Sequence, residues 1–490
     1  MRIDNGGVNL TRRSLLQHTG WFAAAAAIPP IAGLAADSTS PVMTKLSAYM
    51  SEARDRALPD DVMEKAKQHI LDTFAAMVSG SELPPGRAAI KFARAYGGEK
   101  IATVIGSNVL CGPIEAALTN GLLAHSDETD DSHAPSESHP GSSVVPATLA
   151  VGEQFGIDGN HFIRAVTLGY DIGPRVNLTL GGQQYRVETH RATHSIAGNF
   201  GAAAAAGCAV SLNAQQMRWL LDYASQEASG IAAWQRDTDH IEKGFVFAGG
   251  PARNGVTAAL LVQSGWTGVD DVFSGADNFF QANQHPASPA EMIEKLGERY
   301  EITRTNIKKW TVGSPIQAPL DALENLLKKH PFNAEQVQTV NVRVATEEAS
   351  IVDNREVPDI CMQYMVAVML IDKTASFKAA HDKPRMQDPE ILQQRAKVHL
   401  IKDSELQQRM PRREAIVEVT LTGGTKLVEH VEAVRGTAEN PMSRDEVAAK
   451  SRDLMVPVLG AANTTSLIEK ILALENVKNI REFRPLLQRG

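Results

Sequence analysis

The chain has 490 residues, a length that suggests two or three compact units. Its composition, with 43% hydrophobic and 22% charged residues, is typical of a globular protein. A formal net charge of −8 argues against nucleic acid as the main partner, because binding nucleic acid needs a basic surface. Cys111, Cys208 and Cys361 have no metal-binding spacing, and an odd number of cysteines cannot complete a disulfide framework. We therefore expect three buried thiols.

The first 40 residues have the pattern of an export signal. Arg12 and Arg13 precede Leu15 and Leu16, and an alanine-rich run follows, so the segment LTRRSLLQHTGWFAAAAAIPPIAGLAA resembles a twin-arginine (Tat) signal. A spanning anchor is disfavoured, because the apolar run is short and contains two prolines, whereas a spanning helix needs about 20 apolar residues. We expect residues 1–40 to be a signal peptide, the Tat translocon to be a transient partner, and the mature protein to be periplasmic.

Residues 41–300 are predicted to form the first part of a helical domain. Apolar residues recur at helical spacing, and almost no alternating pattern typical of strands occurs before residue 265. Small residues fill the segment NFGAAAAAGCAV, which allows helices to approach closely. The expected helices are 42–80, 87–96, 112–124, 143–156, 161–175, 199–210, 215–230 and 251–265.

The residue pattern changes near residue 300. Val337–Ala345 and Glu414–Thr422 alternate polar and apolar residues with β-branched side chains, as strands do. Helical stretches, 319–329 and 361–371, lie before and between them, without the alternation of a βαβ unit. We predict an α+β domain over 301–438, and C-terminal helices over 439–490 that complete the helical domain. The predicted fold class is mainly α.

A polar loop between two apolar helices is the best candidate for a site. The stretch HSDETDDSHAPSESHPGSSVVP, residues 125–146, gathers carboxylates and imidazoles that are costly to bury unless they are paired. It could be a solvated acidic loop, a metal site using His125 and Glu128, or an acid/base site. The prolines fix the loop backbone and favour the acid/base site. Ser132 and His139 would supply a hydroxyl and an imidazole, and Glu128 or Asp131 would orient them.

Further candidates lie downstream. His190 and His194 precede the small-residue helix, although a histidine there is more often a structural hydrogen-bonding group. Lys243 approaches a glycine-containing helix start, and Lys308 lies at the start of the second domain, although lysines usually lie on solvated faces. Tyr364 lies in an apolar helix, where a tyrosine is usually part of the core. Together these groups are suited to proton transfer on a carboxylate substrate without a cofactor.

The order of these motifs resembles the MmgE/PrpD family, which includes 2-methylcitrate dehydratases, cis-aconitate decarboxylases and an iminodisuccinate epimerase. The similar segments are NGLLAHSDETDDSHAPSESHPGSSVVPA, HSIAGNFGAAAAAG, FAGGPARNGVTAALLVQSGWTG, KKWTVGSPIQAP and MQYMVAVMLID, within residues 43–485. The most specific part is H-x-x-[DE]-x-D-D-[ST] with the HPG that follows. The resemblance implies a large helical domain, a smaller α+β lid, a homodimer, and an active site between the domains that uses no metal.

The resemblance also implies roles for single residues. The pocket carboxylate corresponds to Glu128, where many relatives have aspartate, and the pocket hydroxyl corresponds to Ser132, where many have threonine. The second pocket histidine corresponds to His194, with His190 left open by the local spacing. The expected catalytic residues are His139, His194, Lys243, Lys308 and Tyr364. The expected substrate-binding residues are Glu128, Asp131, Ser132 and His133.

We therefore expect a cofactor-independent lyase acting on a di- or tricarboxylic acid by proton transfer α to a carboxylate. Dehydration is the first expectation and decarboxylation the second. An epimerase or isomerase would use the same groups, and a periplasmic carboxylate-binding protein without catalysis is a further alternative. Which acid is the substrate does not follow from the residues.

Overall fold

Most of the described chain is helical. The computed structural model describes residues 39–283, 287 and 289–489, so the predicted export signal lies outside the described residues except for its last two positions. Among the described helices, none is both long and apolar enough to cross a membrane. The mainly α fold class is confirmed.

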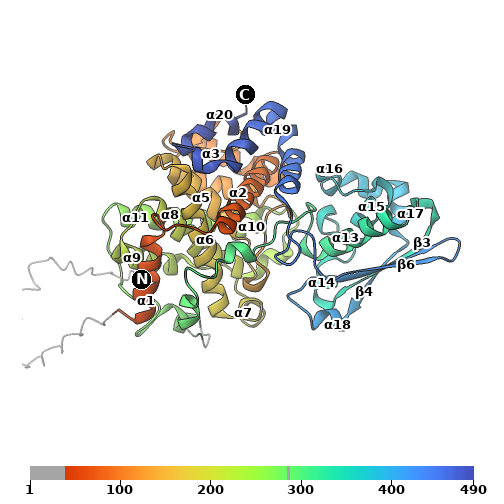
Figure 1. Cartoon of the computed structure of the whole chain (residues 1–490), viewed down its shortest axis with the longest axis horizontal. Coiled ribbons are helices and arrows are strands. Elements are labelled where there is room, and N and C mark those ends of the chain that lie inside the picture. Colours follow the sequence, from red (N-terminus) through yellow and green to blue (C-terminus); the bar gives the residue numbers. More distant parts are fainter. Residues whose placement is uncertain (1–38, 284–286, 288, 490) are drawn as a thin grey trace, which may run out of the picture. The chain divides into compact units, whose positions relative to one another are not determined.

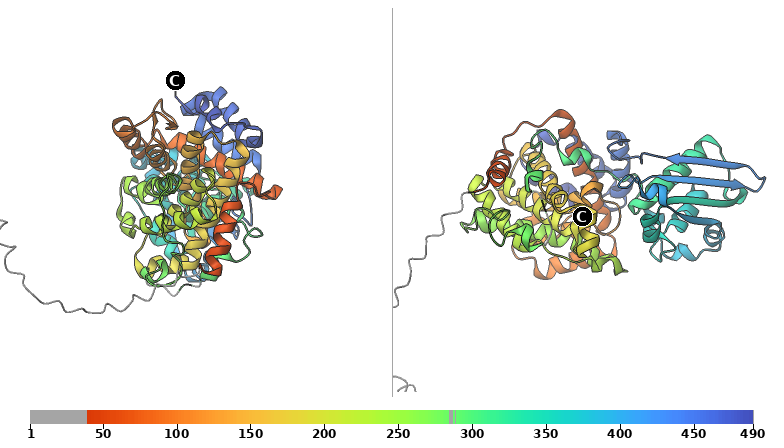
Figure 2. Two further views of the ribbon diagram at one scale, coloured as in Figure 1. Left: turned by 90° about the vertical axis from the view of Figure 1, so that its left-hand side faces the viewer. Right: turned by 90° about the horizontal axis from the view of Figure 1, so that it is seen from below.

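Packed helices form the first and larger hydrophobic core (Figures 1 and 2). All eight of the helical stretches predicted before residue 265 are present, 42–80 as two helices. The helices of this part are α1 (Pro41–Glu52), α2 (Asp60–Gly80), α3 (Pro84–Tyr96), α4 (Pro113–Ala124), α5 (Pro140–Phe155), α6 (Gly159–Leu180), α7 (Gly182–Thr189), α8 (Thr193–Ala209), α9 (Ala214–Glu227), α10 (Ile241–Gly244) and α11 (Gly250–Gln263). Small residues set the close contact of α6 with α8, because a Cβ at Gly173 would lie 2.2 Å from the carbonyl oxygen of Ala197.

A four-stranded sheet and its helices form the second hydrophobic core (Figure 1). The strand order is β4 (Val398–Asp403), β3 (Val337–Ala345), β5 (Ala415–Leu421) and β6 (Lys426–Val431). Helices α13 (Ser314–Lys329) and α15 (Met362–Asp372) pack against the sheet. Buried residues alternate with more exposed ones along β3 and β5, so the sheet has one face in the core.

The sheet differs in two ways from the sequence-based prediction. The strands at 337–345 and 414–422 are present, but β4 and β6 were not predicted. Most side chains of both unpredicted strands are exposed or half-buried, which hides the apolar alternation of a strand. The prediction that this part lacks βαβ character is wrong, because β3 and β4 are parallel and helices connect them.

The C-terminal helix α19 (Arg444–Leu472) returns to the first core, where it packs on α2. Lys450 on this helix donates hydrogen bonds to Asp72 Oδ1 at 2.6 Å and to the carbonyl oxygen of Thr129 at 3.0 Å. From Thr39 onward the chain forms one compact unit with two hydrophobic cores. The division into domains at 300 and 438 therefore stays a prediction.

Candidate functional site

A cavity of about 800 Å³ is lined by segments that belong to both hydrophobic cores. One wall comes from the loop after α4, the start of α8 and the region around α10. The other wall comes from residues 313–315, 347–360 and 380–383. The titratable side chains used below that line this cavity are Asp127, Glu128, His139, His194, His240, Lys243, Asp359 and His381.

Helix ends hold two of the three histidines of the polar loop. His125 caps the C-terminus of α4, and His139 is the N-cap residue of α5, whose first residue is a proline. Gly141 has no room for a side chain, because a Cβ there would lie 2.6 Å from the Tyr170 hydroxyl. Its backbone N–H donates to Asp131 Oδ1 at 3.0 Å. The H-P-G sequence therefore fixes where α5 begins and where His139 lies.

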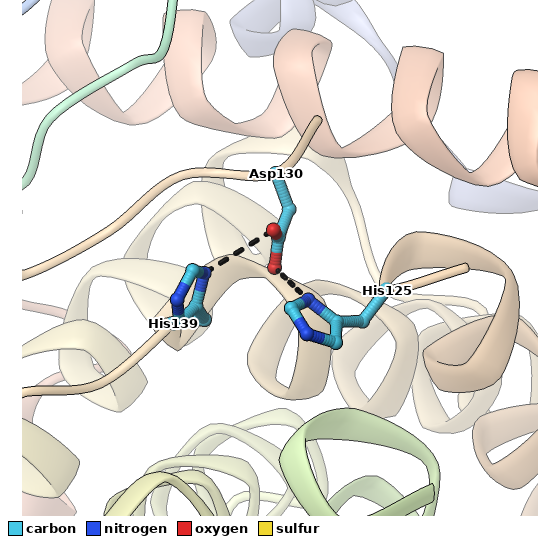
Figure 3. A group of neighbouring side chains, drawn as sticks. All are labelled: His125, Asp130 and His139. Carbon is cyan, nitrogen blue, oxygen red and sulfur yellow. Dashed lines mark hydrogen bonds and ion pairs between the residues drawn. The ribbon is translucent and has the colours of Figure 1, made fainter. Parts of the chain in front are cut away.

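The carboxylate of Asp130 lies between two imidazole rings, as Figure 3 shows. Its Oδ2 accepts from His125 Nδ1 at 2.9 Å, and its Oδ1 accepts from His139 Nδ1 at 3.2 Å. Burial raises the pKa of Asp130, but the two imidazoles and Lys308 outweigh it, so the pKa lies well below its usual range. Because a carboxylate only accepts hydrogen bonds, both histidines carry a proton on Nδ1 and direct Nε2 away from Asp130.

Two lysines converge on Glu128. Lys243 Nζ contacts Glu128 Oε1, and Lys308 Nζ lies 3.6 Å from Glu128 Oε2 and 3.6 Å from Asp130 Oδ1. Lys308 is 3% exposed and also donates to the carbonyl oxygen of Glu128 at 2.9 Å. Burial raises the pKa of Glu128, but the two lysines outweigh it and hold the pKa well below its usual range. Glu128 is therefore a carboxylate in contact with both ammonium groups.

An aromatic stack holds His194 against the cavity. Its ring lies 3.8 Å from that of Phe247, with 10° between the planes. Phe247 belongs to a π-helical turn, Phe245–Gly249, a backbone form often found at functional sites. Burial and the neighbouring cations lower the pKa of His194 to well below its usual range. His194 is therefore a neutral imidazole at physiological pH.

An ion pair joins the two walls of the cavity, and the wall from the second core carries an unpaired carboxyl group. His381 Nε2 lies 3.0 Å from Asp127 Oδ2, and this partner outweighs burial and raises the pKa of His381 to about 9. Asp359 is 3% exposed, and none of the described side chains is within hydrogen-bonding distance of its carboxyl group. Burial and the nearby charges of Glu128 and Asp127 raise the pKa of Asp359 to about 7, although His381 and Lys243 oppose this.

The structure brings four of the five predicted catalytic residues together with Glu128, which was predicted to bind the substrate. Glu128, His139, His194 and Lys243 line the cavity, and Lys308 lies directly behind Glu128. Between the two histidines left open by the sequence, only His194 lines the cavity, whereas His190 is exposed at the C-cap of α7.

Four predicted residues lie elsewhere. Ser132 lines a separate cavity of about 350 Å³, and Asp131, buried, binds His69 Nδ1 at 2.8 Å and the Tyr170 hydroxyl at 2.5 Å. These contacts make Asp131 a structural group of the helical core.

His133 and Tyr364 are also directed away from the cavity. His133 is buried, and its Nε2 lies 3.1 Å from Glu301 Oε2. The hydroxyl of Tyr364 donates to the carbonyl oxygen of Ala379 at 2.8 Å, inside the second core. Tyr364 thus supports the segment that carries His381 rather than lining the cavity.

The sequence interpretation did not select Asp130, His240, Asp359 or His381 as site residues. Asp130 and Asp131 are adjacent in an irregular loop, and no periodicity tells which one faces the imidazoles. His240 lies three residues before Lys243, a spacing that could have indicated it. For Asp359 and His381 the sequence carries no signal, because each lies in a single short turn of the second core.

Within the described residues, two groups of three side chains could hold a metal ion. They are His125, Asp130 and His139, and His125, Glu128 and His240, each with one ligand atom per residue within 4.8 Å of the others. The first group is already linked by hydrogen bonds through Asp130. The expectation that no cofactor is used stays a prediction.

Comparison with known proteins identifies the fold family. The MmgE/PrpD N-terminal domain matches residues 44–291, and the MmgE/PrpD C-terminal domain matches residues 310–475. The chain belongs to the MmgE/PrpD family. The predicted resemblance is thereby confirmed at the level of the family.

Several curated members of the MmgE/PrpD family are similar over most of their length. Cis-aconitate decarboxylase from Aspergillus terreus is 25% identical over 484 residues, which cover 92% of this chain and 96% of the relative. The cis-aconitate decarboxylase-like protein oryM from Aspergillus oryzae is 29% identical over 63% of this chain and 66% of its own length. The Homo sapiens cis-aconitate decarboxylase is 23% identical over 88% of this chain and 91% of its own length. At the family level, these relatives support a lyase.

Proposed function

We propose that the protein is a lyase that acts on a di- or tricarboxylic acid without a cofactor, and that decarboxylation is its first candidate reaction. The observation that carries the proposal is Asp130 between His125 and His139, with Lys308 3.6 Å from Asp130 Oδ1, behind a cavity wall that includes His139 and Lys243. A carboxylate behind an imidazole stabilises the imidazolium that forms during proton transfer. The names of the similar proteins favour decarboxylation over the dehydration expected from the motifs.

The charges of the site suit a substrate with carboxylate groups. Lys243 is held by Glu128 in the absence of substrate, and a substrate carboxylate entering the cavity would share or replace that contact. Lys308, buried behind Glu128, offsets the negative charge of Glu128 and Asp130. Because the cavity wall is buried, these charges act in a low effective dielectric and stabilise developing negative charge strongly.

The proposed reaction needs one proton at carbon. Cleavage of the bond to a carboxyl group releases CO₂ and leaves the electron pair on the α-carbon, delocalised into an adjacent carboxylate near Lys243. The protonated His139 then delivers its Nε2 proton to that carbon, while Asp130 keeps its Nδ1 proton in place. His194, neutral and stacked on Phe247, is suited to accept a hydrogen bond from the substrate or from a replacement proton donor.

The test is an NMR time course in D₂O with a panel of citrate-, methylcitrate-, aconitate- and aspartate-derived acids. We expect one acid to lose CO₂ and to gain deuterium at the α-carbon. His139→Gln should reduce turnover by about 10²–10⁴-fold, the usual contribution of an acid/base group. The matched control is His190→Gln, because His190 is exposed and outside the cavity.

Each outcome has a defined meaning. Loss of water instead of CO₂ would identify a dehydratase, and deuterium exchange without elimination would identify an epimerase. Binding without turnover over hours would support a carboxylate-binding protein. Wild-type rates in a folded His139→Gln variant would refute the assigned role of His139.

We also propose export through the Tat pathway and a homodimer in the periplasm. The support for export is the Arg12–Arg13 motif, and the support for the dimer is the family resemblance. Cell fractionation of the wild type and of an Arg12→Lys, Arg13→Lys variant tests export, and light scattering of the mature protein tests the dimer. Equal periplasmic amounts of both forms, or a monomer, would refute the respective proposal.

A further inference from the structure

Helix α13 begins on the wall that the second core contributes to the cavity. Gly313, Ser314 and Pro315 line the cavity, and Gly313 is the N-cap residue of this 16-residue helix. Glycine has no side chain that could accept from the first N–H groups, and α13 has no side-chain cap hydrogen bond. The N-terminus of a helix combines unsatisfied N–H groups with a partial positive charge, which suits an anion.

Ser314 supplies the hydrogen-bond donors of this helix start. Among the residues that the structure describes, neither its backbone N–H nor its hydroxyl group has a hydrogen-bond partner. Pro315 has no N–H, and the N–H of Ile316 already donates to the carbonyl oxygen of Gly313 at 2.9 Å. The half-buried Ser314 therefore offers two donors to a ligand in the cavity.

The carboxyl group of Asp359 lies beside the start of α13. The backbone N–H of Gly313 donates to the carbonyl oxygen of Asp359 at 2.9 Å, which holds the short turn Pro358–Ile360 against the helix start. Asp359 is buried and lines the cavity, yet no described side chain hydrogen-bonds its carboxyl group. Buried polar groups without a partner are rare and usually have a ligand or a functional reason.

The surroundings of Asp359 keep its carboxyl group protonated up to about neutral pH. Burial is the largest cause of its raised pKa of about 7, and the carboxylates of Glu128 and Asp127, from the loop after α4, add to it. The imidazolium of His381, at the C-cap of α16 (Phe377–Ala380), and the ammonium of Lys243 on α10 lower it less. A protonated carboxyl group donates a hydrogen bond, which an ionised one cannot do.

The other elements packed on this turn bring no charge that reverses this balance. The titratable groups of α15 are Tyr364, whose hydroxyl bonds a backbone carbonyl, and Asp372, which is exposed. Lys378 on α16 is exposed as well. Arg355 and Lys383 line the same wall of the cavity, where their positive charges add to the attraction for an anion.

We propose that Asp359 and Ser314, at the N-terminus of α13, bind a non-reacting carboxylate of the substrate. The inference rests on the proposed function, because it assigns one carboxylate of a di- or tricarboxylic acid to each wall of the cavity. The reacting end lies at His139 and Lys243, and the other end lies at α13. Asp359 donates its O–H to the bound carboxylate, and such O–H···O⁻ bonds are short and strong.

This arrangement sets the substrate class and a pH dependence. A monocarboxylic acid bound at Lys243 would leave Asp359 and Ser314 without a partner, so the site discriminates against it. Above about pH 7 the carboxyl group of Asp359 ionises and repels the bound carboxylate. Substrate affinity is therefore present below this pH and is lost as the pH rises through it.

The test is isothermal titration calorimetry of the purified protein with tricarballylate, a saturated tricarboxylic acid with no hydroxyl group to eliminate. We expect the Kd of the wild type to rise about 15-fold from pH 7 to pH 8.5, as Asp359 ionises while the ligand stays fully ionised. Asp359→Asn keeps an N–H donor and cannot ionise, so its Kd should change by less than about threefold. Ser314→Ala should raise Kd several-fold at both pH values.

The matched control is Asp453→Asn, which removes an exposed carboxylate on α19 and should keep the wild-type pH dependence. Circular dichroism of each variant confirms that it is folded. The proposal is overturned if the wild type shows no saturable binding, if the folded Asp359→Asn variant keeps the wild-type pH dependence, or if Ser314→Ala binds as tightly as the wild type.

The binding assay separates this inference from the proposed lyase activity, because it needs no turnover. The expected pattern of Kd values, together with no turnover of any acid in the panel, would refute the lyase and support the carboxylate site. Turnover together with a pH-independent Kd in the wild type would refute the carboxylate site alone.

Discussion

Replacing Asp359 by asparagine is expected to stabilise the protein above neutral pH and to change little in mild acid. The buried carboxyl group has no described hydrogen-bond partner, and its pKa is raised from 3.8 to about 7. The folded state therefore holds a proton that the unfolded chain has released between about pH 4 and pH 7. The stability that this proton contributes is fully present below about pH 4 and is lost as the pH rises through about 7.

The size of the stability change follows from the rise in the pKa of Asp359. A rise of about 3 pKa units at about 1.4 kcal/mol per unit gives about 4 kcal/mol as an upper value for the cost of the ionised form. Unfolding entropy of about 2.1 cal/mol/K per residue over roughly 450 residues gives about 1 kcal/mol/K, so this cost corresponds to a Tm difference of about 4 °C. Water entering the cavity would reduce this value.

The assay is thermal unfolding by far-UV circular dichroism at one scan rate, at about pH 5 and about pH 8.5. Asp359→Asn should unfold at a higher temperature than the wild type at the higher pH, and the difference should shrink at the lower pH. Asp453→Asn is the matched control, because Asp453 is exposed on α19. An Asp359→Asn variant that is less stable than the wild type at the higher pH, or a pH-independent difference, would refute the reasoning.

The other predictions concern groups around the same cavity. Asp130→Asn should lower turnover by about 10²–10⁴-fold in steady-state assays, because an amide nitrogen would favour the wrong tautomer of His139; a loss below tenfold would contradict this role. Gly141→Ala should lower the unfolding midpoint by several degrees, since the added Cβ would lie 2.6 Å from the Tyr170 hydroxyl; an unchanged midpoint would show that α5 adjusts freely. Tyr364→Phe should cost about 1 kcal/mol in denaturant unfolding and less than tenfold in turnover, because its hydroxyl bonds a backbone carbonyl; a larger loss of turnover would restore its predicted catalytic role.

The helical part of the fold follows directly from the sequence. The predicted helices before residue 265 have apolar or small residues at helical spacing, but their ends are less well predicted: 42–80 is two helices, and α5 begins at Pro140 rather than at residue 143. The sequence does not indicate β4 and β6 because most of their side chains are exposed or half-buried, and the strands pair through backbone groups that a residue pattern does not show. The parallel pairing of β3 with β4 depends on a crossover of more than 50 residues, which no local pattern encodes.

The sequence predicts where the site lies along the chain but not how its side chains are arranged. The polar loop stands out in the sequence because its charged residues lie between two apolar helices, α4 and α5. Within it, the sequence cannot separate Asp130, which binds two imidazoles, from Asp131, which binds His69 and Tyr170. Likewise Tyr364 lies in a helix that is buried all round, so its sequence position does not show where the hydroxyl points.

The contact of Lys450 with the polar loop has a consequence for how the protein is made. The carbonyl oxygen of Thr129 lies one residue before Asp130, and its partner Lys450 is 321 residues further along the chain. A ribosome therefore finishes about nine-tenths of the polypeptide before the loop can receive this support. Until then the growing chain carries the loop's acidic and basic groups without their final anchor. Any premature stop before α19 would yield a product that has nearly all the site residues but lacks the lysine that holds their loop in place.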